Sequence, residues 1–196
     1  MAIIINIDKK IVVKVAYIIE TSKKSGGSYY QTLNLLNDLH KNFSNKKKII
    51  IFSNKKENFQ NYGFHFIFYN FNFFDKIIIK LSTIYLFNFF FRIFNFSTTL
   101  EKSLLKEKID LVIFPNPSIL QYTLRKISFL STIFDLCHLD HSHFPEVNKK
   151  EFLYREKLYK DLSKSAEGII TNSLILKKKI CERYKFPKKK NFFYTI

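Results

Sequence analysis

Short apolar runs alternate with longer amphipathic stretches along the whole chain. The β-branched run at residues 11–19 predicts a strand, and the glycine-containing segment 25–28 after it predicts a turn. A helix is predicted next, because apolar residues then recur at helical spacing while lysine and asparagine fall on the other side. The residues on this apolar face are Tyr30, Leu33, Leu36 and Leu39. Two further strands are expected at 48–52 and 64–69.

The middle of the chain continues the same alternation. Region 74–108 contains neither proline nor glycine, which predicts one long helix or two helices stacked on each other. A strand at 109–114 follows and ends at Pro115. Ser118 is placed to cap a short helix that reaches Lys126. The run 131–136 then predicts another strand.

The last third of the chain predicts two helices and two short strands. Residues 148–164 have the pattern of a charged amphipathic helix, and 168–171 have that of a short buried strand. Ser173 is expected to cap a helix that ends near Tyr184. The fragment 192–196 has the composition of a final strand.

Regular alternation of strands and helices predicts an α/β fold. We expect a Rossmann-like, mostly parallel sheet with helices on both faces and right-handed crossovers. Sheets of this kind bind ligands at the carboxyl ends of their strands. The sequence has no internal repeat and no separate linker, so residues 1–196 are expected to form a single domain.

The composition adds a strong positive charge to this picture. The chain has 33 Lys and Arg against 16 Asp and Glu, a formal charge of +17 over 196 residues. This charge suits nucleic acid or an anionic membrane, and a general bias toward lysine, asparagine, isoleucine and phenylalanine explains it equally well. With 46% hydrophobic residues the chain is expected to fold. Its two cysteines, Cys137 and Cys181, are too few for a disulfide framework, which favours a reducing compartment.

Membrane spanning is not predicted. The first residues lack the basic, apolar and cleavage segments of a secretory signal. The most apolar stretch, 81–91, has eleven residues, whereas a span needs about twenty. Its phenylalanines, flanked by Lys80 and Arg92, fit either a helix in a membrane interface or a helix buried by packing. We therefore expect a cytoplasmic protein, either free or peripheral at the inner face of the plasma membrane.

The first candidate site is the pair Gly26 and Gly27, between the first predicted strand and its helix. Without a Cβ, a ligand can approach the backbone closely, and the amides at a helix N-terminus attract phosphate or sugar oxygens. The pair does not match the dinucleotide-binding pattern G-x-G-x-x-G, and a plain tight turn uses the same residues. Both interpretations stay open.

The second candidate site is the loop 135–146, which holds three of the five histidines of the chain within six positions. Carboxylates and imidazoles after a strand act as acids, bases or ligand-orienting groups. A metal site would take its ligands from His138, His141, His143 and either Asp135 or Asp140. The spacing H-x-x-H-x-H matches no closed structural site, so we expect no metal and favour a sugar- or acceptor-binding loop. A surface loop whose histidines cap the backbone is the remaining interpretation.

Four short runs carry a further signal. They are FDLCH at 134–138, FPE at 144–146, YREKLY at 154–159 and AEGIITNS at 166–173. Together they resemble the N-terminal domain of GT-B glycosyltransferases of the family 4 type, from its His-Asp loop through a charged helix to the following strand. The early glycine pair is similar to the glycine loop of that family. The resemblance extends over about 14–196, except for the aromatic region 55–108.

This resemblance implies one lobe of a two-lobed transferase. In that family the glycine loop faces the donor phosphates and the acceptor across an interdomain cleft, and the His-Asp loop lies on the sugar and acceptor side. The implied catalytic residues are Asp135 and His138, and the implied substrate contacts are Gly26, Gly27, His141, His143 and Ser173. The family commonly has histidine directly before the aspartate, where this sequence has Phe134. Either His138 takes over part of that role, or the usual histidine contact is lost.

The second Rossmann-like domain of the family, which binds the nucleotide of the sugar donor, has no counterpart in the sequence. The implied partners are a nucleotide-sugar donor, a glycan or lipid-linked acceptor, and a second lobe that acts in trans, if at all; no cofactor and no nucleic acid is implied. We expect an N-terminal glycosyltransferase domain with little activity alone. It would be a truncated product, one subunit of a split enzyme or the first half of a broken reading frame.

Two other functions stay open beside this one. A basic α/β module would bind nucleic acid or an anionic membrane without catalysis, and its association would depend on salt. A metallohydrolase built on the His138 loop would retain Zn²⁺ in stoichiometric amounts.

Overall fold

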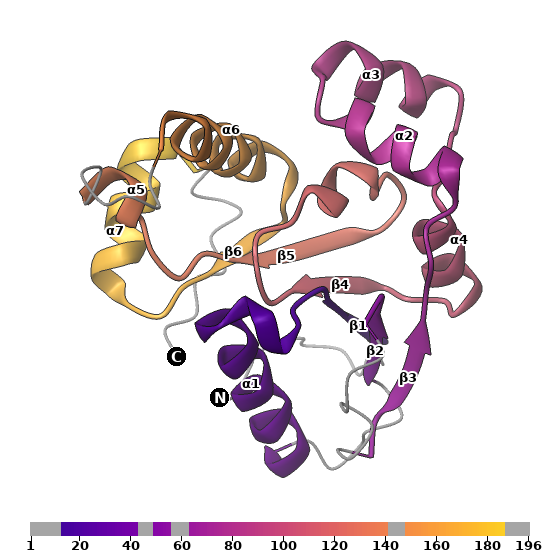
Figure 1. Cartoon of the computed structure of the whole chain (residues 1–196), viewed down its shortest axis with the longest axis horizontal. Helices are drawn as coiled ribbons and strands as arrows, with labels where there is room; N and C mark the ends of the chain where they lie inside the picture. Colours follow the sequence, from indigo (N-terminus) through magenta and orange to yellow (C-terminus); the bar gives the residue numbers. More distant parts are fainter. Residues whose placement is uncertain (1–12, 43–48, 56–62, 141–147, 187–196) are drawn as a thin grey trace. The chain divides into compact units, whose positions relative to one another are not determined.

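The computed structural model describes residues 13–42, 49–55, 63–140 and 148–186 (Figure 1). The chain forms two compact units. The first unit comprises Met1–Pro115 and Ile119–Ser128, and the second comprises Asn116–Ser118 and Phe129–Ile196. Each unit is an α/β arrangement in its own right.

The first unit is built on a parallel sheet. Its strands are β1 (Val15–Ile19), β2 (Ile49–Ser53), β3 (His65–Phe68) and β4 (Leu111–Phe114), in the order β3-β2-β1-β4. In this register Val15 lies opposite Ile49 on one side and Leu111 on the other. All residues of β2 are buried, as expected for a parallel strand that is covered on both faces. The strands predicted in this region are confirmed.

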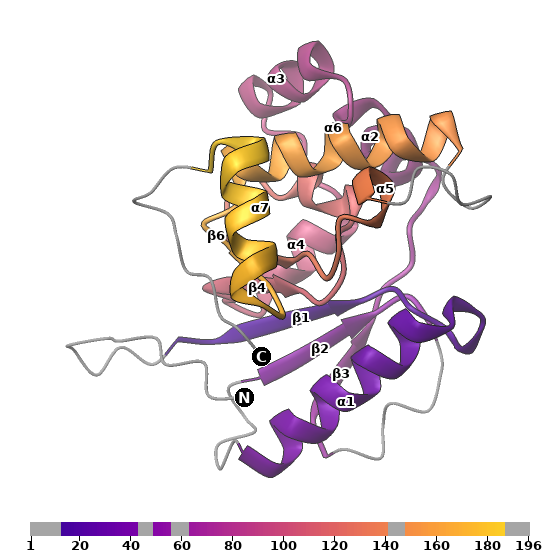
Figure 2. The same cartoon turned by 90° about the vertical axis from the view of Figure 1, so that its left-hand side faces the viewer.

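Helix α1 (Gly27–Asn42) follows β1 through the 3₁₀ turn η1 (Lys23–Ser25). Figure 2 shows α1 running alongside the strands of this unit. Tyr29, Thr32 and Leu36 form its buried face. The predicted face was therefore wrong at Tyr30, which is 65% exposed. The apolar stripe begins one residue earlier, and a hydroxyl takes part in it because Thr32 bonds both Thr21 and the carbonyl of Ser28.

Three helices, rather than one or two, follow β3. They are α2 (Phe73–Ser82), α3 (Tyr85–Ile93) and α4 (Thr99–Lys106). Asn72 caps the start of α2 by accepting a bond from the Asp75 amide. Of the two breaks that follow, the one before α4 has a cap, because Thr98 accepts a bond from the Glu101 amide, whereas Ile84 gives α3 no side-chain cap. Asn95, between α3 and α4, has a φ of 53°, a left-handed conformation that ends a helix. The break between α3 and α4 therefore arises from capping and a left-handed residue without glycine or proline, and the break between α2 and α3 has no side-chain cap.

Two buried carboxylates tie the helices of the first unit together. Asp75 accepts bonds from both the amide and the hydroxyl of Thr99, at 2.9 and 2.6 Å, and from the amide of Asn72. Glu101 accepts bonds from the amides of Arg125 and Lys126. These amides follow the 3₁₀ helix η4 (Ile119–Thr123), which is shorter than the helix predicted up to Lys126. The two carboxylates thus connect elements that lie far apart in the sequence.

Apart from Ser128, the parallel pair β5 (Ser128–Thr132) and β6 (Gly168–Ile170) belongs to the second unit. The one-turn helix α5 (Cys137–Asp140) follows β5, α6 (Lys149–Ser165) leads to β6, and α7 (Leu174–Tyr184) follows β6. The predicted helices that begin after Asn148 and Ser173 are confirmed, and both residues cap them.

The strand predicted at 131–136 was placed too late. After β5 only Ile133 continues the ladder, by donating to the carbonyl of Ile170. The chain then turns because Asp135 accepts a bond from the amide of Cys137, which starts α5. The strand predicted at 192–196 lies outside the described residues.

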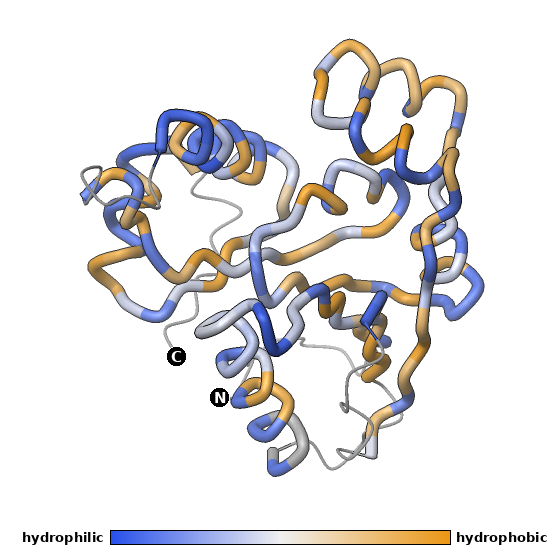
Figure 3. Tube along the Cα trace, viewed as in Figure 1, coloured by the Kyte–Doolittle hydropathy of each residue, from blue (hydrophilic) through white to orange (hydrophobic). Residues whose placement is uncertain are grey.

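The fold is Rossmann-like α/β, as the sequence predicts, and all six strands of the described residues pair in parallel. Hydrophobic residues follow the strands, and they also cover much of α2 and α3 (Figure 3). Within the described residues, no helix combines the length and the hydropathy that crossing a bilayer requires.

Replacing Asp75 by Asn tests whether its carboxylate holds α2 against α4. The Asp75 carboxylate accepts three hydrogen bonds, and the side-chain nitrogen of an Asn in its place could not accept any of them. We expect Asp75→Asn to lower the free energy of unfolding by about 1–3 kcal/mol, measured by urea denaturation. Glu107→Gln is the control, because Glu107 forms a part-exposed pair with Lys14, and its loss should cost less than about 1 kcal/mol. Equal losses in the two variants would refute the proposed role of Asp75.

Candidate functional site

The polar residues of the second unit gather where its two strands end. Thr132 lies opposite Ile170 in the parallel register of β5 and β6. Asp135 follows β5 by three residues, and Ser173 follows β6 by the same number. Because parallel strands end at the same edge, both residues lie at the carboxyl edge of this strand pair. This is the edge at which ligands of parallel α/β sheets bind.

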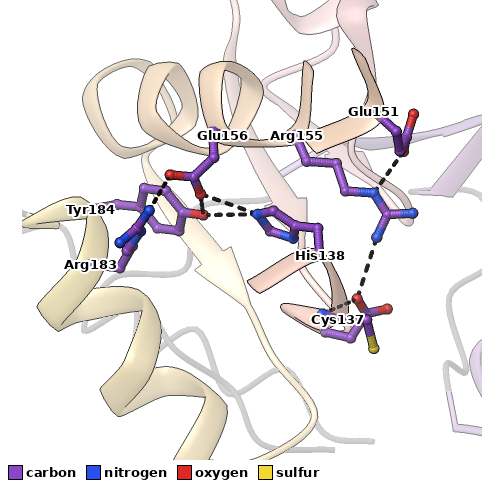
Figure 4. Close-up of polar contacts among 8 residues, drawn as sticks. Cys137, His138, Glu151, Arg155, Glu156, Arg183 and Tyr184 are labelled. Carbon is purple, nitrogen blue, oxygen red and sulfur yellow. Dashed lines mark hydrogen bonds and ion pairs between the residues drawn. The ribbon is translucent and has the colours of Figure 1, made fainter. Parts of the chain in front are cut away.

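Asp135 and Arg155 form a partly exposed ion pair at this edge. Arg155 Nη1 lies 3.5 Å from Asp135 Oδ1, and the two side chains are 31% and 49% exposed. Arg155 Nε donates to Glu151 Oε1 at 2.7 Å, one turn earlier on α6 (Figure 4). Burial lowers the pKa of Arg155, but the bond to Glu151 and the nearby carboxylates outweigh this and raise it. The guanidinium therefore stays charged and presents donors next to an accepting carboxylate.

His138 lies behind this pair and has no exposed surface. Its Nε2 is 3.1 Å from Glu156 Oε1, and its ring packs edge-on against Phe152 and Tyr159. Its Nδ1 is buried without a hydrogen-bonding partner among the described residues. A side chain in this position joins α5 to α6 and presents no surface to solvent.

Glu156 on α6 forms hydrogen bonds with side chains of both α5 and α7. Its Oε1 accepts a bond from the Tyr184 hydroxyl at 2.5 Å, and its Oε2 accepts one from Arg183 Nη2 at 2.7 Å (Figure 4). Burial raises the pKa of Glu156, but the bonds from Tyr184, Arg183 and His138 outweigh it and lower the pKa below its usual range. Burial also raises the pKa of Tyr184, so its hydroxyl stays a donor. An ionised carboxylate on α6 thus holds α5 and α7.

Cys137 is exposed beside Asp135 but lacks the character of a nucleophile. Desolvation raises the pKa of its thiol, and the adjacent Asp135 carboxylate raises it further. A thiol in this environment stays protonated near neutral pH. At this edge the backbone amide of Cys137 donates a hydrogen bond to Asp135 Oδ1 at 3.0 Å, which holds the carboxylate in place.

Gly26 and Gly27 belong to the first unit, at the junction of η1 and α1. Gly26 has a φ of 57°, in the half of conformational space that favours glycine, so the turn itself requires it. A Cβ built on either glycine would meet nothing within 4 Å. The backbone here is open as well as tightly turned, and both interpretations of this pair remain compatible with the structure.

The other predicted site residues divide into two groups. Ser173 caps α7, because its hydroxyl accepts a bond from the Leu176 amide, and its carbonyl accepts one from the hydroxyl of Thr171. His141 and His143 lie outside the described residues. Among the residues that are described, no three His, Cys, Asp or Glu side chains form a metal-binding group. The predicted absence of a metal from the His138 loop stays a prediction.

Sequence reasoning missed three residues of this site: Arg155, Glu156 and Tyr184. Glu151 and Arg155 are four residues apart on a predicted helix, a spacing that signals a charge pair on one helical face. Glu156 and Tyr184 carry no comparable signal. They are 28 residues apart and meet only through the packing of α6 and α7.

No family model matches this chain, and a search of curated proteins finds no match.

Glu156 predicts how the stability of the second unit depends on pH. Its folded-state pKa lies below the unfolded value of about 4.3, so it stabilises the fold above that value and ceases to do so as pH falls through the folded pKa. We expect Glu156→Gln to lower the free energy of unfolding at pH 7, and the difference from the unmodified chain to shrink between about pH 5 and 3.

Urea denaturation followed by circular dichroism measures this difference at each pH. Glu182→Gln is the control, because Glu182 is an exposed carboxylate on α7, and its removal should change little at any pH. A Glu156→Gln deficit that stays constant down to pH 3 would contradict the assignment of an ionised carboxylate.

Proposed function

We propose that this chain forms the acceptor-side domain of a GT-B-type glycosyltransferase, which transfers a sugar from a nucleotide-activated donor to a glycan or a lipid-linked acceptor. Three features support the proposal. The resemblance of residues 134–173 to that family is the first, and the Rossmann-like α/β fold is the second. The third is the position of the Asp135–Arg155 pair within that run, at an edge of parallel strands that suits ligands.

The Asp135–Arg155 pair is the observation that carries the proposal. A sugar hydroxyl both donates and accepts hydrogen bonds, so a carboxylate next to a guanidinium offers it one partner of each kind. Both side chains keep part of their surface in solvent, which a ligand needs in order to reach them. Glu151 holds the guanidinium from behind, so the pair is oriented before a ligand arrives.

In this mechanism Asp135 accepts the hydrogen bond of the attacking acceptor hydroxyl and directs its oxygen toward the donor sugar. The acceptor oxygen forms the new glycosidic bond as the bond between the sugar and the nucleotide phosphate breaks, and the hydroxyl proton leaves toward the carboxylate. Such a step depends on orientation and on stabilisation of the departing phosphate. The family resemblance implies that a second lobe supplies most of that stabilisation.

His138 has a positioning role in this proposal. Its contacts with Glu156 and Tyr159 fix α5, and the start of α5 carries the Cys137 amide that binds Asp135. Gly26 and Gly27 are assigned to the donor side, where their open backbone lies at the start of the sixteen-residue α1. Contacts of His141, His143 and Ser173 with the acceptor are part of the same proposal.

Asp135→Asn tests acceptor binding. We first screen residues 1–196 against an array of glycans and lipid-linked saccharides, and then measure the affinity of the strongest binder by calorimetry. Loss of a hydrogen bond to a charged group predicts at least about tenfold weaker binding by Asp135→Asn. Asp161→Asn is the matched control, because Asp161 also pairs with a cation on α6 but lies away from the strand edge. This control should bind like the unmodified chain.

The resemblance also predicts little or no sugar transfer by this chain alone. Incubation with UDP-glucose, GDP-mannose and the bound acceptor should give no product above background. Transfer at ordinary enzyme rates, no binding to any saccharide, or equal losses in the two variants would each contradict the proposal. Salt-dependent binding that discriminates between nucleic-acid sequences would favour the basic binding module instead.

A further inference from the structure

Helices α2 and α3 expose an unusual amount of apolar surface to solvent. We call this set the α2–α3 surface; it comprises Phe73, Phe74, Tyr85, Leu86, Phe89, Phe90, Ile93 and Phe94. These side chains are between 47% and 86% exposed. Full burial of such a side chain contributes about 1.5–3 kcal/mol, so a partner that covers them gains substantial free energy. Exposed apolar patches of this kind mark interaction surfaces.

Burial by packing, one of the two interpretations of this region from its sequence, does not describe α3. Of its nine residues only Phe91 is buried. The aliphatic and aromatic side chains around it point into solvent on several sides of the helix, so the core of the first unit does not account for them. Helix α3 is thus an apolar helix whose surface is largely exposed to solvent.

The helix is nevertheless held in place. Arg125 lies with its guanidinium carbon 5.5 Å from the ring centroid of Phe91 and donates to the carbonyl of Phe96 and to Ser82 Oγ, at 2.8 and 2.9 Å. These contacts join the C-terminal part of α3 and the residues after it to the last residue of α2 and to the segment after η4. The apolar surface is therefore presented by an anchored helix.

Charge identifies the kind of partner. Residues 76–100 contain three cations, Lys76, Lys80 and Arg92, all exposed, and no Asp or Glu. The nearest carboxylates on either side, Asp75 and Glu101, are buried and accept bonds from neighbouring helices and loops. The charged side chains of residues 76–100 are thus all cationic. A second copy of the chain would bring like charges together, since each copy carries +17.

We propose that the α2–α3 surface docks on an anionic lipid bilayer. The rings and aliphatic side chains enter the boundary between headgroups and acyl chains, and Lys76, Lys80 and Arg92 meet the lipid phosphates. Helices of ten and nine residues are too short to span a bilayer and suit its interface. Single-stranded nucleic acid also stacks on aromatic rings, but the exposed Leu86 and Ile93 offer no stacking face.

Cosedimentation of the full chain with vesicles tests the proposal. We expect binding to vesicles of equal parts phosphatidylcholine and phosphatidylglycerol, and at least tenfold weaker binding to phosphatidylcholine alone. Tyr85→Ser/Leu86→Ser should reduce binding to the anionic vesicles at least about tenfold, because two of the most exposed apolar side chains are lost. Its matched control is Leu174→Ser/Ile175→Ser, a pair that is 68% and 74% exposed on the second unit. This control should bind normally.

A second pair of variants isolates the electrostatic part. Lys76→Gln/Lys80→Gln should weaken binding to the anionic vesicles about thirtyfold, since each cation near such a surface contributes about fivefold. Lys149→Gln/Lys150→Gln removes two lysines that are also exposed, from α6, and should have little effect. Circular dichroism of each variant confirms that it is folded.

Several results would overturn the proposal. They are no vesicle binding, equal binding to both lipid compositions, equal losses in the test and control variants, a dimer on size exclusion that Tyr85→Ser/Leu86→Ser dissolves, or binding to oligouridine that exceeds vesicle binding and depends on the same residues. None of them bears on acceptor binding by Asp135, so this proposal and the glycosyltransferase proposal succeed or fail separately.

Discussion

A carboxylate that is removed from bulk water needs hydrogen-bonding or ionic partners, and this requirement determines how helices pack in both units. Glu156 meets it with Tyr184, Arg183 and His138, and in doing so joins three helices of the second unit. In the first unit Asp75 meets it with two amides and a hydroxyl, and Glu101 meets it at Oε1 with the amides of Arg125 and Lys126. Breaking one side of such an arrangement leaves a charge without compensation. A few carboxylates therefore specify how these helices pack, and removing any one of them lowers the stability of the fold substantially.

The same contacts place the candidate site. Glu156 and the neighbouring Arg155 follow each other on α6, so one helix turns a carboxylate inward to His138 and a guanidinium outward to Asp135. The inward contact fixes α5, and the first amide of α5 fixes Asp135 in turn. The exposed ion pair is oriented because the buried contacts of His138 hold α5 against α6. The buried His138 thus determines the geometry of the exposed pair Asp135 and Arg155.

Much of the fold could be predicted from the sequence because strands and helices leave different periodicities. The run 49–52 is apolar throughout and forms a buried parallel strand, and Asn148 and Ser173 cap the helices that they precede. The division of 74–108 into three helices includes a break at Asn95 and the Thr98 cap, which the absence of glycine and proline conceals, and a break before α3 that no side chain caps. The partners of His138 could not be predicted, because 18 and 46 residues separate it from Glu156 and Tyr184.

Total charge and local charge lead to different conclusions about partners. A charge of +17 fits nucleic acid, membrane and compositional bias equally, because it says nothing about where the cations lie. In residues 76–100 the cations share a short segment with exposed rings and aliphatic side chains, and the carboxylates that flank it face inward. Bias in residue usage explains many phenylalanines, but it does not explain why the fold leaves them uncovered next to exposed cations. A bilayer with anionic headgroups accommodates both properties at once, since its apolar interior and its phosphates lie within one side chain's length of each other.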